Sequence, residues 1–473
     1  MPYSSRLPGG GMRFEMASRF GHTPTADNPR IQERLAHYRK PEDCFDPKRI
    51  EDLVEPTDKL GQATQPTIRY VVAVDGSGHE YEETFDRYPS TRVLYLQIAG
   101  VFIDLEHMSE HEGPFVSPSK IAEATEAAVV AGFLPGSFLE HEKYTDPRTA
   151  FRAELFDLFN ATRIQQQFSL LDLMLEVQKH GIAPDQQAAS RGEILLPKCP
   201  NDSCSLNDSN VARSRGLCVP AHSMIPCPEC GIELWSTDTF RIFESFRPDA
   251  SNGEVMGRCR DIVEHLVLVG VALSLEQLYP KLLPQTAFLY DGDLAVFGEA
   301  ARIFRGLLGI WQAIMGRCIK RDQQPPVVLG IAKTGYPVEH LHGIQRFVPP
   351  GSYMRLDDSY MHEVLRVSSL TETYYGRKFF YHASDGQLIV LTVPPLEGRA
   401  YAKSTAGTPD TDSQPGRFPT LERTFRALDR MGTRLYDDAV IPVSLAHTWA
   451  AYPLNNADHV LRILTEEKLK KKS

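Results

Sequence analysis

Apolar runs of strand length alternate along the chain with segments that repeat their apolar positions at helical spacing. β-branched and apolar residues predict strands at 67–74, 286–290 and 327–332, and a hairpin at 379–382 and 387–393. The stretch 92–105 carries Gly100 near its middle and is interpreted as two strands or one bulged strand. Loose alternation of strands with helices predicts an α/β domain.

Helix signals separate these strands. Ser117-Pro118 and Asp146-Pro147 each supply an N-cap followed by a first-turn proline. They predict helices that run to about Phe133 and to just before Gly181. Further helices are predicted at about 257–278 and at 420–430.

Length and composition are those of a globular protein. With 473 residues, two or three structural units are expected, and 42% hydrophobic with 24% charged residues argues against a largely disordered chain. The longest apolar run, 266–275, is too short to cross a bilayer, so no membrane association is expected. Residues 1–19 are polar and contain no secretory signal pattern, so we expect a cytoplasmic protein.

The charge distribution leaves nucleic-acid binding open. The net charge of −10 argues only weakly against it, because the location of the basic groups matters more than their sum. Residues 301–321 hold five basic residues and no acid, and the chain ends in Lys468, Lys470, Lys471 and Lys472. The simplest interpretation of either segment alone is a solvated basic face.

Five of the eight cysteines fall within 32 residues, a crowding that favours metal binding over disulfides in the cytosol. Cys199 and Cys204 form one candidate pair, and Cys227 and Cys230 form another. Four thiolates suit a closed, structural Zn²⁺ site, although Cys218 or His222 could replace one ligand of the wider first pair. The alternative is a set of buried cysteines without metal. The surrounding residues 183–240 are loop-rich and polar, which predicts a small zinc-ribbon-like insert.

Two aspartates follow predicted strands in the same local sequence, Asp75-Gly76-Ser77 and Asp291-Gly292-Asp293. Ligands collect at the carboxyl ends of strands in open α/β sheets, and carboxylates there can hold a hard divalent cation. Each Asp-Gly alone is more often only a turn, and Asp293 is either a further ligand or a solvated turn residue.

Glu264 lies in a predicted helix whose following residues are apolar on every face. A buried carboxylate there needs a metal or an ion pair with Arg258 or Arg260, and on the residues alone the ion pair is favoured. Glu154 is a weaker candidate for the same role.

Two residues after strands or in apolar segments complete the candidates. Lys333 follows the strand at 327–332 and could contact a phosphate or lower the charge repulsion within a carboxylate cluster. His447 could ligate a metal or act as an acid or base. Each alone is more often an ordinary surface or core residue.

Taken in order, five motifs resemble the NurA nuclease family. They are VAVDGS (72–77), FLYDGDLAVFG (288–298), GIAKTG (330–335), YGRKFFY (375–381) and IPVSLAH (441–447). The resemblance implies an RNase H-like mixed sheet flanked by helices and a manganese-dependent DNA nuclease. It also implies a homodimer that works with HerA, a hexameric DNA-translocating ATPase, in end processing or phage defence.

By position, the resemblance assigns catalytic metal binding to Asp75, Asp291 and His447, and less directly to Glu264. Two departures matter. The family commonly has DGSL where this chain has Asp-Gly-Asp-Leu, and the tyrosine that some members carry just before the histidine has no near counterpart, the closest being Tyr436.

The sequence therefore predicts an N-terminal extension (1–66) and a catalytic domain in two parts (67–182 and 241–473), separated by the insert at 183–240. Mn²⁺ or Mg²⁺ would be held by Asp75, Glu264, Asp291 and His447, while Lys333, Arg302 and Arg305 would grip the DNA backbone. The alternatives are a non-catalytic adaptor that docks DNA or a motor on the same scaffold, and an RNA-directed nuclease.

Overall fold

A computed structural model gives the structure of the protein. It describes residues 3–6, 12–15, 23–38, 46–61, 66–83, 89–109, 125–207, 216–367, 370–401, 413–432, 440–451, 461 and 465. The chain forms two compact units, residues 1–46 and 47–473. The first contains the hairpin β1 (Tyr3–Arg6) and β2 (Met12–Glu15) and the short helices α1 (Thr23–Ala26) and α2 (Pro29–Leu35).

The second unit is built on a nine-stranded mixed sheet in the order β3-β15-β16-β17-β14-β13-β4-β5-β6. The strands are β3 (Val54–Pro56), β4 (Tyr70–Glu83), β5 (Thr91–Asp104), β6 (Thr125–Pro135), β13 (Thr286–Asp291), β14 (Val327–Ala332), β15 (Ser352–Arg355), β16 (Arg377–His382) and β17 (Leu388–Val393). β4, β13 and β14 are parallel neighbours, and every other neighbouring pair is antiparallel. Three antiparallel strands followed by two parallel ones give the expected RNase H-like mixed sheet.

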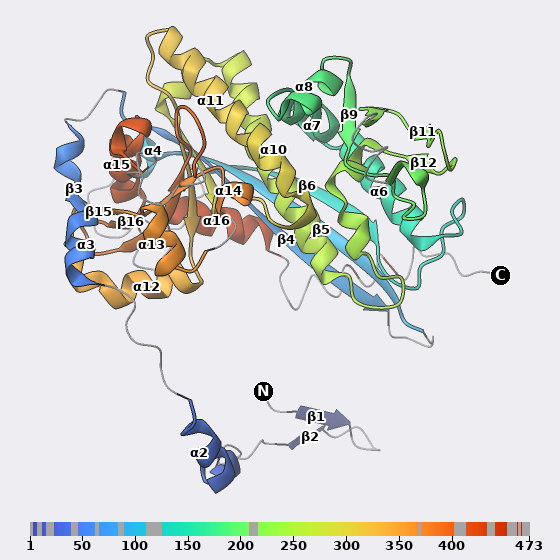
Figure 1. The fold of residues 1–473 in the computed structure, drawn as a ribbon, viewed down its shortest axis with the longest axis horizontal. Helices are drawn as coiled ribbons and strands as arrows, with labels where there is room; N and C mark the ends of the chain where they lie inside the picture. Colours follow the sequence, from blue (N-terminus) through green and yellow to red (C-terminus); the bar gives the residue numbers. More distant parts are fainter. Residues whose placement is uncertain are drawn as a thin grey trace. The chain divides into compact units, whose positions relative to one another are not determined.

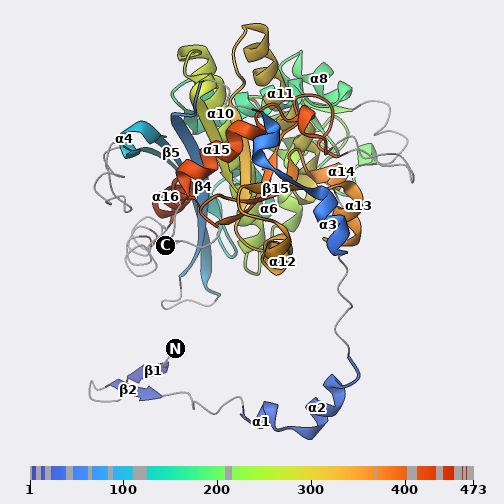
Figure 2. The ribbon, with the colours of Figure 1, turned by 90° about the vertical axis from the view of Figure 1, so that its left-hand side faces the viewer.

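Helices cover both faces of this sheet (Figures 1 and 2). One face packs against α6 (Pro147–Ala161), α7 (Leu170–Lys179), α10 (Gly253–Leu278) and α11 (Phe304–Lys320), and the other against α15 (Leu421–Met431) and α16 (Ile441–Ala450). Alternate residues of β4 enter the two cores, because successive side chains of a strand point to opposite faces. Val72 and Val74 face α10, whereas Val71 and Ala73 face α16.

Shorter elements complete the unit. The helices are α3 (Pro47–Leu53), α4 (Leu105–Ser109), α8 (Ala183–Ala189), α12 (Tyr336–Ile344), α13 (Asp358–Glu363) and α14 (Leu370–Thr373). The small strands are β7 (Arg163–Ile164), β8 (Phe168–Ser169), β9 (Glu193–Leu196), β10 (Leu217–Pro220), β11 (Ile225–Pro226) and β12 (Glu233–Leu234). Among the described residues, no helix is both long and apolar enough to cross a membrane.

Several sequence expectations about single elements were wrong. β4 does not stop at Asp75 but continues to Glu83, in unbroken register with β5. Of the two alternatives for residues 92–105, the single strand is present, but its register shows no bulge at Gly100. The described part of the expected helix 117–133 is strand β6, and the expected helix 146–181 is two helices, α6 and α7. Pairing with β5 along its whole length outweighs the local helix signals of β6.

The segment 183–240, predicted to be an insert, contributes residues to the main core. Its buried residues Ile194, Val219 and Leu234 belong to the same apolar cluster as α10 and the sheet. At the other end of the sheet, the edge strand β3 comes from residues that the sequence assigned to the N-terminal extension.

Candidate functional site

Three elements bring Asp75, Asp291 and His447 together. Val74 of β4 lies opposite Tyr290 of β13 in the parallel register, so the next residues, Asp75 and Asp291, lie side by side on neighbouring strands. By the alternation of side chains along each strand, both aspartates lie on the face of the sheet that packs against α16, the helix that carries His447. β13 ends at Asp291 while β4 runs on to Glu83, so the site lies at the carboxyl end of β13.

Hydrogen bonds orient the three side chains. Gly76 N donates to Asp75 Oδ1 at 2.8 Å, and His447 Nδ1 lies 2.8 Å from Asp75 Oδ2. An ionised carboxylate only accepts hydrogen bonds, so His447 Nδ1 is the donor in this contact, which leaves Nε2 as the ring nitrogen not used by Asp75. Lys333 Nζ donates to Asp291 Oδ2 at 2.7 Å. The His447 side chain is 64% exposed, which opens the site to solvent.

The donor set fits a hard divalent cation. One ligand atom from each of Asp75, Asp291 and His447 lies within 4.8 Å of the other two. Burial raises the pKa of Asp291, and the neighbouring Asp75 raises it further, whereas Lys333 and His447 lower it. Two carboxylates and an imidazole therefore share a small, partly dehydrated space, and Mn²⁺ or Mg²⁺ would relieve their repulsion.

Glu264 approaches this site from the α10 face of β4. Its carboxylate packs against Gly76, where an added Cβ would overlap Glu264 Oε1. Burial, together with the charges of Asp75 and Asp261, raises the pKa of Glu264 to about 8, while Arg260 lowers it. Arg260 Nε lies 3.3 Å from Glu264 Oε1, so the ion pair weighed from the sequence is present. Among the described residues, Glu264 does not join the group of three within 4.8 Å.

The other candidates for this site lie elsewhere or outside the described residues. Glu154 lies on α6, where its Oε1 is 3.4 Å from His141 Nε2. Arg302 forms an ion pair with Asp185 and donates to the Leu195 carbonyl at 3.1 Å. Its side chain stays 23% exposed, so a contact with DNA remains a prediction. Tyr436 and the lysines of the C-terminal tail lie outside the described residues.

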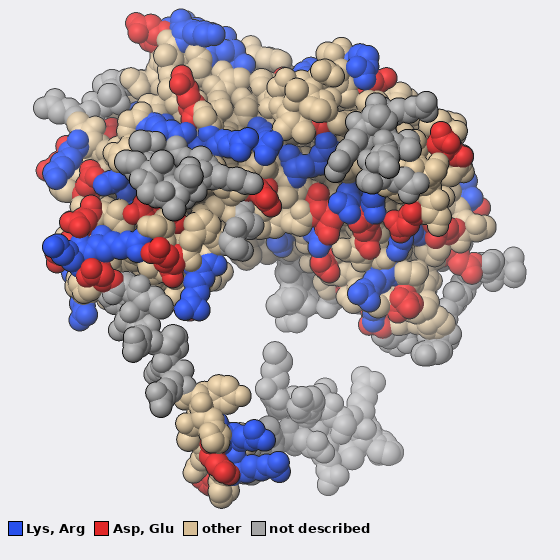
Figure 3. Space-filling view, in the orientation of Figure 1, with Lys and Arg blue, Asp and Glu red and all other residues tan. Residues whose placement is uncertain are grey.

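Arg305 is the second residue of α11, and its guanidinium lies over the ring of Phe304, 5.5 Å from the ring centroid. On the face of the second unit seen in Figure 3, basic and acidic side chains are intermixed, with a row of Lys and Arg across its upper half. This face therefore has no single sign of charge.

Two residues near the aspartates, Lys378 and Tyr290, were not predicted from the sequence. Lys378 is buried and binds Asp293, and Tyr290 donates through its hydroxyl to Asp261 at 2.7 Å. A lysine inside an apolar strand was the signal for Lys378, since a buried ammonium requires a partner. Asp293 is therefore neither a solvated turn residue nor a member of the three-residue group.

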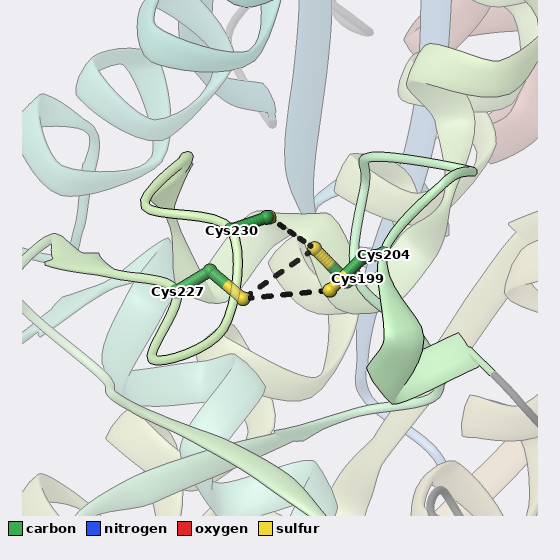
Figure 4. Close-up of side chains that lie close together, drawn as sticks. All are labelled: Cys199, Cys204, Cys227 and Cys230. Atoms are coloured by element: carbon green, nitrogen blue, oxygen red, sulfur yellow. Dashed lines mark hydrogen bonds between the residues drawn. The ribbon is translucent and has the colours of Figure 1, made fainter.

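The four cysteines of the two pairs face one another across two loops (Figure 4). Cys199 Sγ lies 3.7 Å from the sulfurs of Cys227 and Cys230, and Cys204 Sγ lies 3.8 Å from that of Cys227. A tetrahedral zinc ion with bonds of about 2.3 Å holds its sulfurs about 3.8 Å apart. The three distances match this spacing, and four sulfur ligands would leave no position for a catalytic water.

The two alternative zinc ligands are placed elsewhere. Cys218 lies on β10 beside the guanidinium of Arg191, and His222 pairs with Asp172 at 3.0 Å. The wider first pair, Cys199 and Cys204, therefore supplies both of its own sulfurs.

Comparison with known proteins gives only distant matches. No protein-family model and no curated protein matches the chain. The crystal structure of the NurA nuclease from Sulfolobus solfataricus is similar over 97% of this chain and 100% of that chain, at a TM-score of 0.34 and 10% identity. A crystal structure of NurA, and another of NurA bound to dAMP and manganese, each cover 96% of both chains at a TM-score of 0.29, with 10% and 11% identity. TM-scores of this size carry no argument about function, which has to rest on this chain's own residues.

Proposed function

We propose that this protein is a metal-dependent nuclease that hydrolyses DNA phosphodiester bonds. The observation that carries the proposal is the convergence of Asp75, Asp291 and His447 within 4.8 Å at the end of β13. Lys333 adds a cation at the same place, and the five NurA-like motifs supply four of these residues. A scaffold that only docks DNA has no need for converging carboxylates, which disfavours the adaptor alternative.

Each residue has a role set by its contacts. Asp75, Asp291 and His447 would hold Mn²⁺ or Mg²⁺, which lowers the pKa of a bound water and stabilises negative charge on the phosphate. His447, tethered through Nδ1 to Asp75, presents Nε2 either to that ion or to a proton. Lys333, 25% exposed beside Asp291, would turn its ammonium toward a phosphate oxygen. Contacts to phosphate carry no base information, so we expect little sequence preference.

The partners follow from the NurA resemblance and remain part of the proposal. We infer that the protein acts as a homodimer with a HerA-type hexameric ATPase, in double-strand break processing or phage defence. A net charge of −10 makes unaided capture of DNA weak, and a motor that feeds the strand would compensate for it.

End-labelled linear DNA, incubated with the full chain and Mn²⁺ with and without the ATPase, tests the proposal. Asp291→Asn removes one carboxylate charge and should reduce cleavage at least a hundredfold. Asp157→Asn changes an exposed aspartate of α6 and should cleave like the wild type. A matched RNA substrate separates DNA from RNA specificity. Absence of cleavage in every combination, from folded and zinc-loaded protein, would contradict the nuclease and favour the adaptor.

A further inference from the structure

The second carboxylate of the Asp291-Gly292-Asp293 turn is held inside the protein. Lys378 Nζ lies 2.6 Å from both carboxylate oxygens of Asp293, and the Tyr374 hydroxyl donates to Oδ2 at 3.2 Å. The Lys378 side chain is only 1% exposed, so it cannot reach a phosphate in solvent. Both carboxylate oxygens of Asp293 therefore accept hydrogen bonds from protein donors.

The same strands fix the residue that follows. Leu294 N donates to Thr392 Oγ1 at 2.8 Å, and Thr392 lies directly opposite Lys378 in the β16–β17 register. Leu294 O accepts from Tyr375 N at 2.9 Å and from Gly376 N at 3.0 Å. The turn that begins with Asp291 is therefore anchored on its far side to β16 and β17.

The turn at residues 291–293 also packs closely against the neighbouring strand β14. A Cβ added to Gly330 of β14 would overlap the Gly292 carbonyl, so the turn rests directly on the neighbouring strand. Gly292 has φ +140°, which L side chains rarely adopt. Two lysines then hold the two carboxylates, Lys333 on Asp291 and Lys378 on Asp293.

We propose that Lys378 is a positioning residue for the metal centre, and that Asp293 is not a metal ligand. Lys378 neutralises Asp293 and draws it away from the metal side, so that Asp291 alone of this turn faces Asp75 and His447. This explains how the chain carries aspartate where the related motif has serine. Without Lys378, an unpaired carboxylate two residues from Asp291 would compete for the cation. The inference rests on the proposed function for its activity readout only.

A rescue experiment tests the proposal with the full chain. Lys378→Met should lower kcat for Mn²⁺-dependent cleavage at least tenfold, and adding Asp293→Ser should restore it to within threefold of the Asp293→Ser single variant. By calorimetry, Asp293→Ser should keep the Kd for Mn²⁺ within threefold of wild type, whereas Asp291→Ser should raise it at least tenfold. This Kd comparison needs no cleavage, so the positioning proposal and the nuclease proposal can fail separately.

Arg317→Met is the matched control, because Arg317 Nη2 lies 2.6 Å from the buried carboxylate of Glu276 at the far end of α10. It should lower Tm without changing kcat. Three results would overturn the proposal: a rise in Mn²⁺ Kd for Asp293→Ser equal to that of Asp291→Ser, a double variant as inactive as Lys378→Met, or a Lys378→Met protein that loses only Tm. Should Lys378→Met fail to fold, the Asp293→Ser and double variants still decide the question.

Discussion

Replacement of Glu264 by glutamine probes the most perturbed carboxyl group beside the metal centre. Glu264 is 3% exposed, and its pKa rises from 4.5 to about 8 when the chain folds without metal. Between these values the folded protein holds a proton that the unfolded chain has released, so stability falls as pH rises through the window. Each pKa unit is worth about 1.4 kcal/mol, which sets an upper limit of about 5 kcal/mol on the loss. Movement of the half-exposed Arg260 side chain toward the ionised carboxylate will reduce this loss of stability.

Urea denaturation from pH 5 to pH 8 in buffer free of Mn²⁺ and Mg²⁺ measures this effect. Glutamine does not titrate, so Glu264→Gln should lose this part of the pH dependence. It should match the wild type near pH 5 and exceed its free energy of unfolding by a few kcal/mol at pH 8. Glu339→Gln removes an exposed carboxylate and should keep the wild-type slope. Equal slopes for wild type and Glu264→Gln would refute the reasoning.

Three further perturbations follow from the geometry. Cys227→Ser removes one of the four cysteines that would hold zinc, so bound zinc should fall below one ion per chain. Tm should fall by several degrees because the cluster lies in the main core, and full zinc content with unchanged Tm would contradict this. Gly76→Ala forces a methyl against Glu264 and should cost about 1–3 kcal/mol in the free energy of unfolding, so an unchanged denaturation midpoint would argue against the close packing of α10. Lys333→Met removes the cation that lowers the pKa of Asp291, so the pH midpoint of Mn²⁺ binding should rise; an unmoved midpoint would show that Lys333 does not act on this carboxylate.

The sequence correctly predicted that Asp75 and Asp291 converge, but it wrongly placed Asp75 at the end of its strand. Asp75 and Asp291 converge because β4 and β13 are parallel neighbours in matching register. However, Asp75 does not end its strand. Its glycines serve close packing instead, since Gly76 and Gly78 leave room for Glu264 and Met256 of α10. A strand that continues beyond its neighbour cannot be told from an Asp-Gly turn by local sequence.

The features that the sequence did not predict depend on contacts between residues far apart in the chain. His447 is far from Asp75 in the chain, and only the resemblance connected it with the site before the 2.8 Å contact was known. Arg302 lies in a basic segment that is typical of DNA binding, yet it forms an ion pair with Asp185, which is distant in the sequence. Helix signals before β6 gave way to pairing with β5, and such tertiary pairing has no local signature. The cysteine pairs were predictable because their spacing is local.

Anomalous scattering from crystals of the full chain soaked in Mn²⁺ locates the bound metal ions. We expect a manganese peak within bonding distance of Asp75, Asp291 and His447, and a separate zinc peak among Cys199, Cys204, Cys227 and Cys230. The manganese peak should disappear in Asp291→Asn while the zinc peak stays. Manganese bound elsewhere, or an Asp291→Asn protein that keeps the peak, would contradict the assignment of these three residues as the metal centre.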